Sequence, residues 1–67
     1  MKKAIFKMIL DFYQNNNQSG MTVSWILDTF IKQGDANVSL EEINDALEQL
    51  QKEGKIIWMV GGFYKPS

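Results

Sequence analysis

The sequence predicts a small α+β domain in which three helices precede a β-hairpin. Two stretches have apolar residues at helical spacing, a third begins with a helix-capping motif, and the C-terminal stretch is rich in strand formers around a Gly-Gly pair. The chain has 67 residues, which is enough for one domain with one core. We therefore expect residues 1–67 to fold as a single unit.

The first predicted helix covers residues 2–14 and is apolar at almost every position. Its polar residues recur at helical spacing: Lys3, Lys7, Asp11 and Gln14. So narrow a polar stripe is typical of a helix at the centre of a core, or of one covered by its own domain on one side and by a partner on the other. Residues 15–20 are rich in turn formers and predict a loop.

A second helix is predicted to begin after Thr22 or Ser24, either of which can cap it, and to stop at Gly34. Residues 21–23 form either a short strand or the approach to this helix. One helix face is apolar: Val23, Ile26, Leu27, Phe30 and Ile31. Trp25 lies on the opposite stripe, where it is either an exposed aromatic anchor for a partner or, after a shift in helix phase, a core or subunit-edge residue.

The third predicted helix has the best-defined start in the chain. Residues 39–42, Ser-Leu-Glu-Glu, form a capping box in which the serine hydroxyl and the second glutamate each accept a bond from the other's backbone amide. The helix should run from Leu40 to about Glu53, with Gly54 in the position of a C-terminal glycine cap. Its core stripe comprises Leu40, Ile43, Ala46, Leu47 and Leu50.

Residues 55–65 predict a hairpin with a two-residue turn at Gly61-Gly62. This turn places Val60 opposite Phe63. One face then carries Ile56, Trp58, Val60 and Phe63, and the other carries Ile57, Met59 and Tyr64. Because a hairpin can bury only one face against three helices, the second apolar face is either surplus surface for a partner or the sign of a different register.

This order of helix, short strand, helix, capped helix and hairpin resembles the winged-helix superfamily. The resemblance spans essentially the whole chain and is clearest from Ser39 to Tyr64, through the capped helix, Glu53-Gly54-Lys55-Ile56 and the Gly-Gly turn. It implies a three-helix domain whose hairpin is a wing. In this superfamily the third helix often enters the DNA major groove and the wing touches the DNA backbone or minor groove, whereas other members use the same surfaces to bind proteins.

The predicted third helix presents an acidic stripe that argues against DNA: Glu41, Asp45 and Glu48. Like charge repels phosphate, the chain has no arginine, and its net charge is −1. The residues left for DNA contacts are Asn44, Gln49, Lys52, Lys55 and Lys65. We therefore favour a protein-protein interaction or regulatory module, with a weak DNA-binding regulator as the alternative.

The candidate protein-binding residues fall into two groups. Four are aromatic or apolar, namely Trp25, Ile57, Met59 and Tyr64, and three form the acidic stripe, namely Glu41, Asp45 and Glu48. The partner is either another protein or a second copy of the chain. A homodimer would cover the apolar first helix and the second face of the hairpin, which so short a chain is not expected to cover from within.

Catalysis is not expected, because the chain lacks both histidine and cysteine. These absences remove the commonest general base and metal ligand, and also disulfides. Asp35, Asn37 and Ser39 imitate half of an EF-hand loop, but the required glycine and glutamate are replaced by Leu40 and Ala46. We expect no enzyme activity, no cofactor and no bound metal. No apolar run approaches the ~18 residues of a membrane span, so we expect a cytoplasmic protein without membrane contact.

Overall fold

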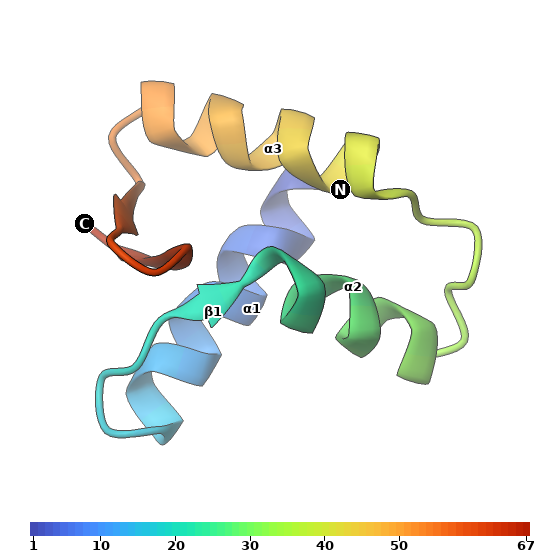
Figure 1. Cartoon of the computed structure of the whole chain (residues 1–67), viewed down its shortest axis with the longest axis horizontal. Coiled ribbons are helices and arrows are strands. Elements are labelled where there is room, and N and C mark those ends of the chain that lie inside the picture. The colour runs from blue at the N-terminus through green and yellow to red at the C-terminus, as the bar shows by residue number, and fades with distance from the viewer.

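The computed structural model describes residues 1–67 and contains three helices and one three-stranded antiparallel sheet. The elements in chain order are α1 (Lys2–Asn15), β1 (Met21–Thr22), α2 (Val23–Lys32), α3 (Leu40–Lys52), β2 (Ile56–Met59) and β3 (Phe63–Pro66). The hairpin of β2 and β3 follows one end of α3, and the long α2–α3 connection lies at its other end (Figure 1). The predicted α+β class, with three helices and a C-terminal hairpin, is confirmed.

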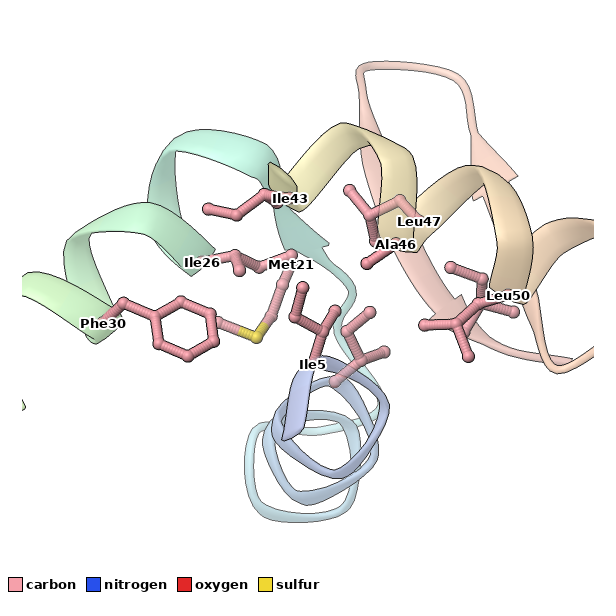
Figure 2. Packing of buried hydrophobic residues seen from close by; sticks show 10 residues of the cluster. Ile5, Met21, Ile26, Phe30, Ile43, Ala46, Leu47 and Leu50 are labelled. Carbon is pink, nitrogen blue, oxygen red and sulfur yellow. The ribbon is translucent and has the colours of Figure 1, made fainter. Parts of the chain in front are cut away.

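One apolar core lies between the helices and the sheet. Its buried residues come from all three helices, β1 and β2: Ile5, Ile9, Met21, Ile26, Phe30, Ile43, Ala46, Leu47, Leu50 and Ile56. Side chains from α1, α2 and α3 converge with Met21 among them (Figure 2). α1 packs against both α3 and β3, and it contributes Ile5 and Ile9 to the core. Its residues Phe6, Met8 and Phe12 are only partly buried, so the homodimer that would cover this helix stays a prediction.

α1 ends in a run of asparagines that satisfy its last carbonyl groups. The side-chain amides of Asn15 and Asn16 donate to the carbonyl oxygens of Asp11 and Phe12, at 2.8 and 3.0 Å. The next two residues have positive φ angles of 56° and 62°, which asparagine and similar polar residues tolerate better than most. The chain leaves the helix in this loop and returns along the sheet as β1.

α2 begins at the first of its two predicted caps, because the Thr22 hydroxyl accepts a bond from the Trp25 amide at 3.1 Å. Ile26 and Phe30 are buried, as predicted, and Leu27 packs against the edge of the core. Ile31, at the edge of the predicted apolar face, is 49% exposed. It is one residue beyond Phe30, about 100° further around the helix, and lies outside the face that α3 covers.

α3 has the predicted capping box. The Ser39 hydroxyl accepts a bond from the Glu42 amide at 3.2 Å, and the Glu42 carboxylate accepts one from the Ser39 amide at 3.3 Å. The four apolar residues that follow in the predicted stripe are all buried: Ile43, Ala46, Leu47 and Leu50. Leu40 is 49% exposed, contrary to prediction, because it is the first helical residue and lies one turn before the core begins at Ile43.

The sheet has the order β1-β3-β2, so the short segment at Met21 is a strand. Met59 pairs with Phe63, and a three-residue loop joins them. The predicted pairing of Val60 with Phe63 is therefore wrong by one residue. The Gly62 amide donates to the Met59 carbonyl oxygen at 3.0 Å and closes the turn.

The shifted register exchanges two aromatic residues between the faces of the sheet. Tyr64 pairs with both Met21 and Trp58, and it packs against the core. Phe63 lies on the opposite face with Ile57 and Met59, since directly paired residues and alternate residues share a face. Tyr64 was thus assigned to the wrong face, whereas the assignment of Ile57 and Met59 was right.

Candidate interaction surfaces

The outer face of the sheet and the tip of its hairpin carry an apolar patch, which we call the wing surface: Ile57, Met59, Val60 and Phe63. Val60 is 91% exposed at the tip, and the other three are between 39% and 45% exposed. The opposite face holds buried Ile56 and Met21, which fix the hairpin to the core. The sequence alternation of β2 therefore produces a hairpin that is anchored on one side and apolar on the side facing solvent.

A shallow hollow borders the wing surface where the α1–β1 loop approaches it. Met59 and Phe63 line this hollow of about 250 Å³ together with Gln18, Ser19 and Gly20. A Cβ atom on Gly20 would lie 2.8 Å from the Tyr64 carbonyl oxygen, so only glycine allows this approach. The loop consequently forms one wall beside the apolar patch.

Trp58 is an exposed aromatic residue that the sequence interpretation did not select. It shares a face with buried Ile56, yet it is 50% exposed. A hairpin that projects from a body of only three helices leaves its distal residues uncovered on both faces. That projection is the signal that could have identified Trp58 as a second aromatic residue of the wing.

Trp25 lies at the molecular surface, where it is 47% exposed. Its ring packs edge-to-face on Phe12, with the ring centroids 4.5 Å apart and the planes at 68°. The two rings join α1 to α2 along an open groove of about 520 Å³, which we call the α1–α2 groove. Met8, Met21 and Phe30 contribute further apolar lining.

The acidic stripe of α3 is exposed as predicted: Glu41, Asp45 and Glu48. Glu48 is paired with Lys52, whose Nζ lies 3.3 Å from its Oε1. No ion pair engages Glu41 or Asp45. This helix face therefore retains two uncompensated carboxylates.

The residues proposed for DNA contacts do not form one positive patch. Asn44 and Gln49 are exposed on α3, but the charge of Lys52 is balanced by Glu48. Lys65 pairs with Ile57 across the sheet and lies on its outer face. Lys52 and Lys65, which DNA binding would bring together, are thus divided between α3 and the apolar side of the wing.

Lys55 shares the carboxylate of Glu53 with Lys2. Its Nζ lies 3.5 Å from the Glu53 carboxylate and 5.8 Å from the centre of the Phe6 ring. Glu53 also accepts a hydrogen bond from Lys2. This bond, assisted by the charges of Lys2 and Lys55, lowers the pKa of Glu53 below its ordinary value of 4.5. Glu53 is therefore ionised at neutral pH and offsets positive charge at the base of the wing.

The structure contains no group of three or more acidic, histidine or cysteine residues that could hold a metal ion. None of its helices combines the length and the apolar character needed to span a membrane. The absence of catalytic activity and the cytoplasmic location stay predictions.

Three helices, a three-stranded antiparallel sheet and a projecting hairpin define a winged-helix domain. Residues 1–62 match the model of a protein family described as "MCM4, winged helix domain". The chain therefore belongs to the MCM4 winged-helix domain family, and its resemblance to the superfamily is confirmed. Neither the comparison with curated proteins nor the comparison with solved structures gave a match.

Proposed function

We propose that this chain is a non-enzymatic winged-helix module that docks on another protein through the wing surface. The observation that carries the proposal is the contiguous apolar patch on the outer face of the sheet, where Ile57, Met59 and Phe63 are half-exposed side by side. Clustered apolar residues on a small domain mark interaction sites, whereas single exposed ones are ordinary. Trp58 adds a large aromatic side chain of the kind that anchors protein interfaces.

The charge distribution supports a protein partner over DNA. Phosphate binding requires lysines or arginines whose charge is free to replace counterions. Here Lys52 and Lys55 are paired with glutamates, and Glu41 and Asp45 face solvent without cationic partners. A duplex lying along α3 would meet more negative charge than positive.

Membership in a family named for MCM4 supports a place for the module in DNA replication. We therefore propose that the partner is a protein of a replication assembly. The second candidate function is DNA binding by the winged helix itself, because many proteins with this fold bind DNA. The contact residues would then be Asn44, Gln49, Lys52, Lys55 and Lys65.

Titration of a fluorescent random-sequence DNA duplex, followed by anisotropy at physiological salt, separates the two candidates. We expect a dissociation constant weaker than about 10⁻⁴ M, the weak end of ordinary non-specific binding. Micromolar affinity with a steep salt dependence would overturn the proposal. In that case Lys52→Ala and Lys55→Ala should each reduce the salt slope, and Gln51→Ala, a neutral exposed position on the same helix, should leave it unchanged.

A further inference from the structure

The lining of the α1–α2 groove repeats with every turn of α1. One stripe of the helix lines it: Ala4, Lys7, Met8, Asp11, Phe12 and Asn15. At 1.5 Å per residue this stripe is about 17 Å long. α2 and its C-cap residue form the other wall, from Trp25 to Gln33. The two helices point in different directions (Figure 1), and the contact between Trp25 and Phe12 joins them.

A helical ligand suits this groove better than an extended one. Both walls are helices, whose backbone groups are already paired within each helix. The only strand at the groove is β1, which has two residues and contributes Met21. An extended segment would have no strand edge with which its backbone amides and carbonyls could form hydrogen bonds, whereas a helix forms these hydrogen bonds within itself.

The apolar lining of the groove indicates the apolar character of such a ligand. Trp25 presents a half-exposed ring in edge-to-face contact with Phe12, and Met8, which has a flexible thioether side chain, also lines the groove. Methionine and aromatic side chains together form adaptable surfaces for the apolar stripe of an amphipathic helix.

The rim supplies charge complementarity. Lys7 and Asp11 both line the groove, one helical turn apart, and neither forms an ion pair within the chain. A lysine that precedes an acidic residue by four positions is the less favourable order for pairing within a helix. One cation and one anion are thus left at defined places along the rim.

We propose that the α1–α2 groove binds one amphipathic helix of a partner protein. The apolar stripe of that helix lies on Trp25, Phe12 and Met8, and an acidic and a basic residue one turn apart face Lys7 and Asp11. The inference rests on the proposed protein-docking function, but it uses a surface separate from the wing.

The test is a selection on the full chain from phage displaying helical peptides of about 14 residues, roughly four turns, with a fixed apolar stripe and randomised flanking positions. We expect enriched peptides to carry one acidic and one basic residue four positions apart. Their binding should shift the amide resonances of Lys7 and Phe12 and the indole resonance of Trp25. Absence of binders, or binders whose shifts fall on the wing surface, would overturn the groove site.

Two variants make the result specific to the groove. Trp25→Ala should weaken the selected peptides about tenfold or more, as loss of an aromatic anchor does, while Met59→Lys should leave their affinity unchanged. Lys7→Glu alters only an exposed side chain, and selection on that variant should now enrich peptides with two basic residues. If Trp25→Ala impairs folding, Lys7→Glu decides alone, and an unchanged charge preference overturns the proposal. Groove binding without any protein contact at the wing would instead contradict only the proposed function.

Discussion

Gly61 and Gly62 determine which side chains the wing turns toward solvent. Their φ angles are +100° and +84°, a region that costs residues with a Cβ atom about 1–2 kcal/mol. They follow Val60 in the loop that lets Met59 pair with Phe63. The orientation of the wing surface therefore depends on two residues that have no side chain.

We expect Gly62→Ala to lower the free energy of unfolding by about 1 kcal/mol. An added Cβ atom at this position meets no atom within 4 Å, so the cost is conformational. Gly61→Ala should cost more, because its Cβ atom would lie 3.0 Å from Cε2 of Phe63. Urea denaturation measures both variants, and unchanged midpoints would mean that the loop has another conformation.

The same loop limited what could be predicted about the candidate site. A Gly-Gly pair is a strong signal for a two-residue turn, and nothing in the sequence indicates that Val60 belongs to the loop. A slip of one residue exchanges the faces of a strand, which explains why Tyr64 was chosen in place of Phe63. Ile57 and Met59 were assigned correctly because the alternation within β2 does not depend on its partner strand.

Among the elements, α3 is the one that local sequence specifies most completely. Its N-cap, its end near Gly54 and four buried core positions follow from signals within the helix itself. Leu40 was placed in the core because periodicity cannot show where coverage by other helices begins. β1 was left undecided because its identity as a strand depends on pairing with β3, far along the chain.

We expect Ser39→Ala to lower the free energy of unfolding by about 1 kcal/mol. The substitution removes the hydroxyl that caps the helix contributing the most buried residues. Ser39→Asp keeps an acceptor and adds negative charge at a helix N-terminus, so it should retain most of the stability. Chemical denaturation decides the matter, and equal midpoints for wild type and Ser39→Ala would contradict a role for the cap.

The order of the helices and strands follows the sequence prediction, and the family match confirms the winged-helix class. The sequence left two roles open for the first helix. In the structure α1 packs against α3 and β3, while Met8 and Phe12 line the open α1–α2 groove. The homodimer therefore stays a prediction. The neighbours that bury Ile5 and Ile9 lie on distant parts of the chain, and helical periodicity alone does not identify them.

We expect the chain to be monomeric at low micromolar concentration and to self-associate only near millimolar concentration. The wing surface has few residues, whereas stable interfaces bury about 1,200–2,000 Å² in total. Sedimentation equilibrium across this range tests the expectation, with Met59→Lys as the variant that should remain monomeric throughout. A dimer at low micromolar concentration would contradict the expectation, and a dimer unaffected by Met59→Lys would show that copies of the chain meet at another surface.

Site-specific photo-crosslinking in cells tests whether the wing surface is a protein-docking site. A benzoylphenylalanine residue replaces Phe63, and a matched probe replaces Gln51, which is exposed on α3 outside the patch. We predict that the probe at position 63 forms a discrete crosslinked protein band that Met59→Lys abolishes, while the probe at position 51 forms none. Equal crosslinking at both positions, or crosslinks from position 63 to nucleic acid alone, would contradict the claim.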